Sequence, residues 1–311
     1  AYEIYQCDWS SDVCSSDLIP EVKFKPKGIK FPLPSNYNPV TRHYDETVPW
    51  NGSFKSYNEY TNNLAWVIYW VLRNADWGMD IAGADVDLGA FYTFAKYCDE
   101  LVDNGKGGTE PRFTINHQFV ERDAVPQFLM YLLNLGNANF ATNEFGQIKI
   151  VWDGYGQPIT KIITNANVID GLFQYSSNDL ESRTNLVNVT YMREELLGDS
   201  DTANFYDQTL IDRYGLQTAD VILAGCTSEG QALRKARWTL YNNCYLTEII
   251  TFKQLFQGAD YAVGDLISIM DSDNVTVAPK HAVISGYSYS DRKSTRLNSS
   301  HTDISRMPSS A

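Results

Sequence analysis

The block AWVIYW at residues 65–70 is the most apolar part of the chain, and it lies between PSNYNP at 34–39 and YCDE at 97–100. The turn-forming residues before it end at Asn62 or Asn63, either of which can accept a backbone N–H and cap a helix. The sequence predicts a helix over residues 64–74, and Trp77-Gly78 ends it. We interpret this helix as buried, because the apolar run is too short for the roughly 20 residues that cross a bilayer.

Working outward from this block, apolar residues recur at three- and four-residue intervals between Val86 and Cys98 and predict a second helix with Asp85 as its cap. Further helices are expected at 121–135 and 227–243. Strands are expected at 22–33, 112–115, 186–191, 247–256 and 266–270, with a hairpin over 140–153. The acidic stretch 194–207 is expected to be a long surface loop. This mixture predicts an α+β fold, with strands dominating after residue 162.

Composition excludes several classes of function. The 311 residues carry a formal charge of −13, whereas binding to phosphate backbones needs clustered Lys and Arg. We therefore expect no specific nucleic-acid binding. No apolar run is long enough to span a membrane, and the N-terminus shows no secretory signal. Synthesis in a bacterial cytoplasm fits these features.

Two pairs of acidic residues invite an enzymatic interpretation, Asp85 with Asp87 and Asp99 with Glu100. Glycoside cleavage needs two carboxyl groups about 5 to 9.5 Å apart across the scissile bond. Residues one or two positions apart on a helix do not converge in that way. We expect these acids to be helix caps or solvated, and we predict no catalytic residues and no enzymatic activity.

No metal or cofactor site is predicted. His43, His117 and His281 are isolated, and Cys98, Cys226 and Cys244 lack metal-type spacing, so we interpret the three cysteines as buried thiols. The run Asp271–Asn274 resembles the start of a calcium loop but lacks its glycine and distal glutamate. The basic residues Arg234, Lys235 and Arg237 are expected to form a solvated helix face.

Aromatic residues form the remaining candidate site. The chain has 20 Tyr, 14 Phe and 7 Trp, and large amphipathic rings suit protein interfaces and sugar-stacking surfaces alike. Trp66, Trp70 and Phe94 are expected in the core. A polar, loop-like stretch holds six rings with little to bury them locally, and we predict that they form an interface: Tyr37, Tyr44, Trp50, Phe54, Tyr57 and Tyr60.

Both ends of the chain differ abruptly from the rest. Residues 1–18 (AYEIYQCDWSSDVCSSDL) and 291–311 (DRKSTRLNSSHTDISRMPSSA) show no helical or strand period and resemble translated sequencing-adapter sequence. We expect both segments to be non-native, which removes Cys7 and Cys14 from consideration; the alternative is flexible natural tails.

The ordered pieces PSNYNP, AWVIYW, YCDE and GGTEPRFTIN (107–116) resemble the tail tip protein J family of lambda-type phages. The resemblance runs from Ile19 to about Asp273. It includes GADVD at 83–87, FQYS at 173–176, RTN at 183–185, RYG at 213–215 and GCTS at 225–228. Each short motif alone is weak, whereas their order over this length is specific.

The resemblance implies a fragment of the central tail-hub region, with β-rich hub domains and several packed helices like those of baseplate hubs. It implies a trimeric hub that closes the distal tail tube, contacts other tail-tip and tail-tube proteins, and supports host attachment and DNA delivery in the virion. The host receptor is expected to be bound only through C-terminal modules absent from this chain. The resemblance carries over no catalytic or cofactor residue. The alternative function is a carbohydrate-binding or glycan-hydrolysing protein acting on the host envelope.

The expected domain organisation follows the changes in pattern along the chain. We expect a strand and an aromatic loop over 19–62, an α+β hub domain over 63–165, and a β-rich hub domain with one long helix over 166–290, between the two non-native ends.

Overall fold

The structure is a computed structural model, which describes residues 28–47, 49–117, 125–143, 145–154, 159–177, 183–193, 199–255, 263–272, 280–289 and 294–301. The helices are α1 (Leu64–Arg73), α2 (Leu88–Asp99), α3 (Val125–Leu135), α4 (Gln208–Tyr214) and α5 (Glu229–Tyr245). The strands are β1 (Lys30–Pro34), β2 (Tyr37–Asn38), β3 (His43–Tyr44), β4 (Phe54–Tyr60), β5 (Leu101–Asp103), β6 (Thr109–Pro111), β7 (Ala138–Thr142), β8 (Ile148–Trp152), β9 (Ile159–Thr164), β10 (Phe173–Ser177), β11 (Leu186–Met192), β12 (Ser200–Tyr206), β13 (Thr218–Ile222), β14 (Glu248–Leu255), β15 (Leu266–Met270), β16 (Lys280–Tyr289) and β17 (Ser294–His301). The predicted α+β class is confirmed.

Helices α1 and α2 form where the sequence predicts them. The side chain of Asn63 accepts hydrogen bonds from the backbone N–H groups of Ala65 (3.0 Å) and Trp66 (3.4 Å), which otherwise lack partners in the first turn of α1. Helix α2 is capped by Asp87, whose carboxylate accepts from the Ala90 N–H at 3.0 Å. Asp85, the predicted cap, lies instead in the short 3-10 helix Gly83–Asp85 just before it.

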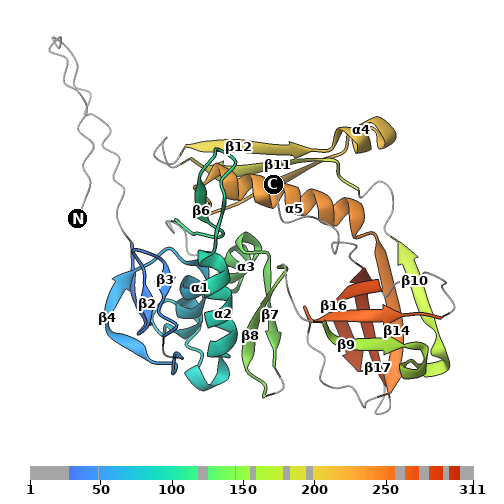
Figure 1. Ribbon diagram of the computed structural model, residues 1–311, viewed down its shortest axis with the longest axis horizontal. Helices are drawn as coiled ribbons and strands as arrows, with labels where there is room; N and C mark the ends of the chain where they lie inside the picture. Colours follow the sequence, from blue (N-terminus) through green and yellow to red (C-terminus); the bar gives the residue numbers. More distant parts are fainter. Residues whose placement is uncertain are drawn as a thin grey trace, which may run out of the picture.

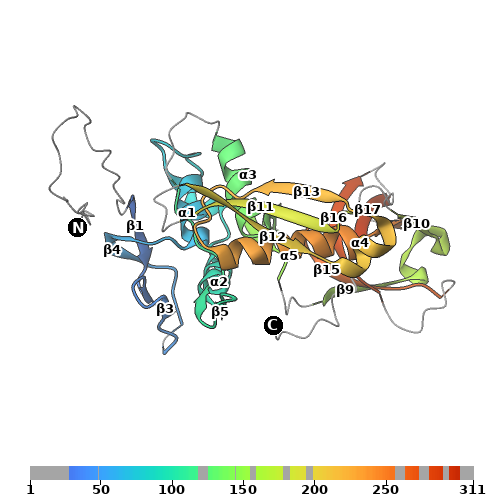
Figure 2. The ribbon, with the colours of Figure 1, turned by 90° about the horizontal axis from the view of Figure 1, so that it is seen from above.

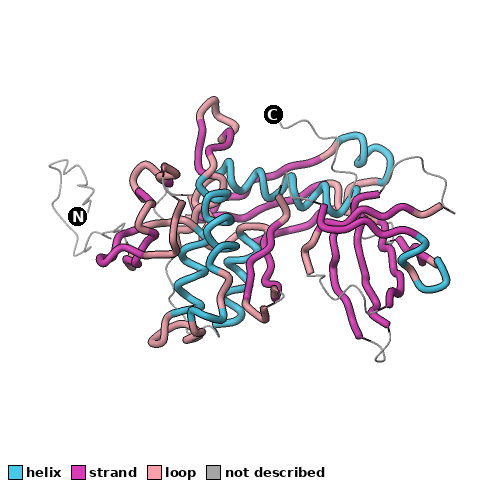
Figure 3. Tube along the Cα trace, turned by 60° about the horizontal axis from the view of Figure 1, so that its bottom comes forward, coloured by secondary structure: helices cyan, strands magenta, loops and turns pink. Residues whose placement is uncertain are grey.

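The larger hydrophobic core lies between α1, α2, α3, the β7–β8 hairpin and α5. Trp66, Phe91 and Phe94 are fully buried there, and removing each ring from water contributes roughly 2 to 3 kcal/mol. Figure 1 shows α1–α3 with β7–β8 on one side of the molecule and a large sheet on the other, while α5 with β11 and β12 runs along both. Figure 3 shows the same division, with α1–α3 gathered on one side and the strands of the large sheet on the other.

A three-stranded sheet, in the order β12-β11-β13, packs on α5 and completes the larger core. Strand β11 pairs antiparallel with β12 and parallel with β13, and its alternate residues Val187, Val189 and Tyr191 are buried. The predicted strand at 186–191 is therefore confirmed. The loop expected at 194–207 is wrong for Ser200–Tyr206, which forms β12; residues 194–198 lie outside the described residues.

The smaller core lies within a six-stranded sheet of order β10-β14-β17-β16-β15-β9. The turn before β15 connects the two cores, because Gly264, at φ +92°, approaches Val151 so closely that a Cβ atom there would lie 2.6 Å from that side chain. Beside it, Lys149 Nζ lies 3.3 Å from Asp265 Oδ1. Strand β17, which belongs to the segment expected to be non-native, pairs through its backbone with β14 and β16.

None of the helices in the described ranges combines the length and the apolar character that a bilayer crossing needs.

Candidate functional site

The six aromatic residues predicted as an interface lie on β2, β3, β4 and the turn before β4, next to α1 and α2. Tyr37 and Tyr44 are buried, with 2% and 5% exposure, and their rings stack at 4.4 Å. Both residues are thus shielded from solvent, although the local sequence offers little to bury them. The reason is tertiary: β2 and β3 form a hairpin whose rings pack on Trp66 and Tyr92, far along the chain.

The other four residues are more exposed than these two. Trp50 stacks on Tyr92 at 4.6 Å, and Phe54 packs edge-on against Trp66 at 6.0 Å, so both are half-buried. Tyr60 is also half-buried, with its hydroxyl 3.5 Å from Asn116 Oδ1. Tyr57 alone among the six is largely exposed, at 58%. The interface itself stays a prediction, and β4 carries its accessible part.

An ion pair fixes the β2–β3 hairpin to the end of α2. Arg42 Nη1 lies 2.5 Å from Asp99 Oδ1, the same guanidinium donates to the side-chain oxygen of Asn62, and the Tyr44 hydroxyl donates to Asp99 Oδ2 at 3.2 Å. Arg42 itself has a left-handed φ of 55°, which costs a non-glycine residue of the order of 1 kcal/mol or more. The contacts of its side chain offset that cost.

Asp99 corrects the prediction made for the acidic residues. It was expected to be a cap or solvated, but it is buried, with 6% exposure. Burial raises the pKa of Asp99, and the charge of Arg42 opposes that rise. A carboxylate in the last turn of a helix is disfavoured by the helix dipole, so an acid at this position signals a nearby cation. That signal was available in the sequence, although it could not identify Arg42 as the partner.

The other three acids considered as catalytic candidates, Asp85, Asp87 and Glu100, either have partners within the chain or are exposed. Asp87 caps α2, which confirms the capping interpretation, and its second oxygen accepts from Asn143 Nδ2 at 3.2 Å. Glu100 is exposed and pairs with Arg112 at 2.8 Å. Asp85 is exposed. These positions serve capping and ion pairing within the chain.

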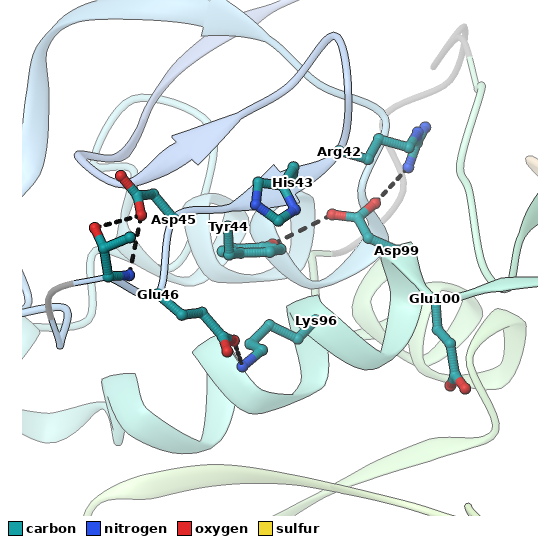
Figure 4. Close-up of a pocket in the computed structure, with 9 residues that line it drawn as sticks. Arg42, His43, Tyr44, Asp45, Glu46, Lys96, Asp99 and Glu100 are labelled. Atoms are coloured by element: carbon teal, nitrogen blue, oxygen red, sulfur yellow. Dashed lines mark hydrogen bonds and ion pairs between the residues drawn. The ribbon is translucent and has the colours of Figure 1, made fainter.

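A surface pocket of about 710 Å³ lies between the hairpin and the end of α2 (Figure 4). Its lining residues are Arg42, His43, Tyr44, Asp45, Glu46, Thr47, Lys96, Asp99 and Glu100. Lys96 forms an ion pair with Glu46, and this contact lowers the pKa of Glu46. Hydrogen bonds from Thr47 lower the pKa of Asp45. The charged groups of the pocket are largely paired with one another across its walls.

The basic residues of α5 correct another prediction. Lys235 is buried, not solvated, and its ammonium donates to Asn134 O (2.7 Å), Asn134 Oδ1 (2.8 Å) and Asn137 Oδ1 (2.6 Å) at the end of α3. Burial lowers the pKa of Lys235 to about 8. Arg234 also faces inward and pairs with Glu110 at 2.6 Å. The last carbonyls of a helix attract cations, which explains the inward orientation of Lys235.

The cysteines and the acidic run at 271–274, which the sequence analysis considered as possible metal ligands, lie apart from one another. Cys98 and Cys226 are buried free thiols, and burial raises the pKa of both, that of Cys226 to about 12; Cys244 is half-buried. Asp271 accepts from Asn165 Nδ2 (3.0 Å) and the Tyr175 hydroxyl (2.7 Å), while Asp273 and Asn274 lie outside the described residues. Within the described ranges, no three His, Cys, Asp or Glu side chains gather in a metal-binding group.

Comparison with known proteins gives the chain its relatives. Residues 128–278 match the family model described as a putative phage tail protein. Tip attachment protein J of Escherichia phage SECphi27 is 32% identical over 265 residues, which is 83% of this chain and 22% of that protein. Tip attachment protein J of Escherichia phage SECphi4 is 30% identical over 257 residues, 82% of this chain and 22% of that protein. The chain thus spans about a fifth of the length of these relatives.

A solved structure shows the same fold. A chain in the virion of a native gene transfer agent particle superposes with a TM-score of 0.56 at 10% identity, covering 80% of this chain and 49% of that one. At this identity the likeness concerns the fold alone. The sequence relatives confirm the resemblance to tail tip protein J.

Proposed function

We propose that the chain is a structural component of a phage or prophage tail tip, part of a hub that closes the distal tail tube and supports host attachment and DNA delivery. The observation that carries this proposal is the sequence match to two tip attachment proteins over more than four fifths of the chain. The fold shared with a chain of a gene transfer agent virion agrees with it. The protein is made in the bacterial host and located in the virion.

The hub acts as a homotrimer, through shape and surface contacts with other tail-tip and tail-tube proteins. The host receptor is bound by other modules of the complete protein. We divide the chain into an entry segment (19–62), an α+β domain (63–165) and a β-rich domain (166–290), and α5 with β11 and β12 of the last segment packs on the α+β domain. The exposed aromatic Tyr57 on β4 supports the proposal that part of residues 37–60 serves a protein contact.

The role of the chain is not catalytic. This is supported by the contacts that its acidic residues make within the chain: Asp87 caps a helix, Asp99 pairs with Arg42, and Glu100 pairs with Arg112. A carboxyl group that acts on a glycan must reach the scissile bond, and these groups are committed to contacts inside the chain.

Deletion of the complete gene from a phage or inducible prophage tests the proposal. We expect particles that lack a closed tail tip and do not infect, with both defects restored by the gene supplied in trans. Mass spectrometry of purified virions should then detect peptides from residues 28–289. Infectious particles from the deletion strain that contain none of these peptides would contradict the proposal. Turnover of host-envelope glycans that is lost on replacing Asp85 or Asp99 would favour the carbohydrate-active alternative.

A further inference from the structure

Two Asn-Gly pairs lie in turns of the chain, Asn51-Gly52 just before β4 and Asn104-Gly105 between β5 and β6. Strand β4 lies at the periphery of the molecule in both views (Figures 1 and 2). Both glycines have a left-handed φ, 83° for Gly52 and 75° for Gly105. Because glycine has no Cβ atom, its backbone nitrogen is open to the side chain of the preceding asparagine. Each pair is therefore a candidate for loss of the asparagine amide.

The reaction open to such a pair is deamidation. The backbone nitrogen of the glycine attacks Cγ of the asparagine, its proton leaves with the amide nitrogen as ammonia, and a cyclic succinimide forms. Water then opens the ring. Cleavage of the bond between the ring nitrogen and Cγ gives aspartate, whereas cleavage of the bond to the backbone carbonyl carbon gives isoaspartate, in which the chain runs through the side chain. The reaction consumes only water and changes no oxidation state.

The two asparagines share one feature of local structure. Asn51 Oδ1 accepts from the Ser53 N–H at 3.0 Å, and Asn104 Oδ1 accepts from the Lys106 N–H at 2.8 Å. In a turn of this kind the asparagine side chain folds over the next peptide group. The side-chain amide therefore lies near the glycine nitrogen that attacks it at both positions.

Further contacts restrain the second pair. The Gly105 N–H donates to Asp103 Oδ1 at 2.8 Å, so this nitrogen would have to lose its proton beside a negative charge. Asn104 Oδ1 also accepts from the Gly108 N–H at 3.0 Å, and Asn104 is half-buried. Asn51 is exposed, and in the part of the chain that the structure describes no carboxylate accepts from the nitrogen that follows it. The fold thus leaves the first pair more reactive than the second.

We propose that Asn51 is a site of spontaneous deamidation in the folded chain, whereas the fold protects Asn104. The consequence falls on Trp50, whose indole N–H donates to Ser53 O at 2.7 Å and whose ring stacks on Tyr92. Isoaspartate adds a backbone atom between these hydrogen-bonded partners, and either product adds a carboxylate. The reaction therefore alters the turn that carries Trp50, one of the predicted interface residues. The inference goes beyond the proposed function, since the reaction needs only water.

Storage of the purified full chain in neutral buffer at body temperature, followed by peptide mapping with mass spectrometry, tests the inference. Storage in water labelled with heavy oxygen marks each event with a labelled carboxyl oxygen, which distinguishes it from conversion during digestion in ordinary water. Asn51 should deamidate about tenfold faster than Asn104, because the positioning of reacting groups governs intramolecular rates. Isoaspartate should be among the products. In guanidinium, which unfolds the chain, the two rates should converge.

Two variants separate the chemistry from the fold. Asn51→Gln should stop the reaction at this position, because the longer side chain forms the ring far more slowly, and should leave Asn104 unchanged. Asp103→Ala frees the Gly105 N–H and should speed up deamidation of Asn104 several-fold without changing Asn51, while circular dichroism shows a folded chain. The inference is overturned if Asn51 keeps its amide in the folded chain, if Asn104 reacts as fast there, or if Asp103→Ala leaves Asn104 as slow as in the wild-type chain.

Discussion

The larger core around α1 and α2 and the smaller core of the six-stranded sheet are built from different side chains. The larger core combines stacked aromatic rings with buried polar groups such as Asn63, Asp99 and Lys235, each of which has particular partners far along the chain. The smaller core contains eight buried apolar residues of the described part, mostly isoleucine: Ile163, Val168, Ile250, Phe252, Ile267, Ile269, Ala282 and Ile284.

This difference predicts where single substitutions should change the stability of the fold most. Buried polar groups are costly unless each finds its partner, so they fix one arrangement of the elements around them. An aliphatic sheet face is held by many similar contacts and tolerates exchanges of similar volume. We therefore expect the larger core to respond sharply to single substitutions and the smaller core weakly.

Trp66→Ala should have the largest effect. Trp66 is fully buried among Trp50, Phe54 and Tyr69, and its indole N–H donates to Tyr44 OH at 3.1 Å. Loss of the ring should lower the free energy of unfolding by about 3 to 5 kcal/mol. Urea denaturation followed by circular dichroism measures this. A loss below about 1 kcal/mol would mean that the aromatic cluster does not hold the larger core together.

Arg42→Ala should cost about 3 kcal/mol at neutral pH, because it leaves the buried Asp99 carboxylate without its cation. Without Arg42 the pKa of Asp99 rises further, so Asp99 becomes protonated on acidification and the cost should shrink as the pH falls. Urea denaturation of wild type and variant across acidic and neutral pH checks this. The control is Lys96→Ala, which breaks an exposed pair with Glu46 and should leave the unfolding midpoint unchanged. An equal loss at every pH would argue against a buried charge.

Lys235 should make stability depend on pH in the alkaline range. Its pKa is about 8 in the folded chain against 10.5 for an ordinary lysine, so between these values the unfolded chain binds more protons. The free energy of unfolding should therefore rise with pH across this window, by about 3 kcal/mol from this group. The difference between wild type and Lys235→Met, measured by denaturant titration from pH 7 to pH 10.5, isolates the effect. A difference that stays flat would show that the pKa is not lowered.

Ile267→Val in the smaller core should have the smallest effect, about 1 kcal/mol, and Ile68→Val on α1 is its matched partner in the larger core. Hydrogen exchange should show faster opening of β15 and its neighbours for Ile267→Val, with α1 and α2 unchanged. Ile68→Val should do the reverse. Equal changes in both regions for either variant would show that the two cores unfold as one unit.

Local features of the sequence were sufficient for several of the regular elements of the fold. Asn63 before an apolar run predicted α1, the hairpin over 140–153 appears as β7 and β8, and the strands at 247–256 and 266–270 appear as β14 and β15. Strands β4 and β12 were missed because most of their residues are polar and the apolar ones alternate only weakly. Local pattern cannot reveal that another part of the chain covers one face of such a strand.

The candidate site depended on contacts that sequence patterns do not contain. Arg42 and Asp99 are 57 positions apart, and Lys235 reaches Asn134 across about a hundred residues. The positions of Asp99 at a helix end and of Lys235 among small alanines were signals that these charges are not simply solvated. Identifying their partners requires the packing of the helices, which only the structure supplies.

Cryo-electron microscopy of the tail tip, in virions that carry the complete protein, tests the central claim most directly. The account predicts density for three copies of the α1–α2 body and the six-stranded sheet around the tail axis, at the distal end of the tube. A resolved tip whose subunits cannot accommodate residues 28–289 of this chain would contradict it.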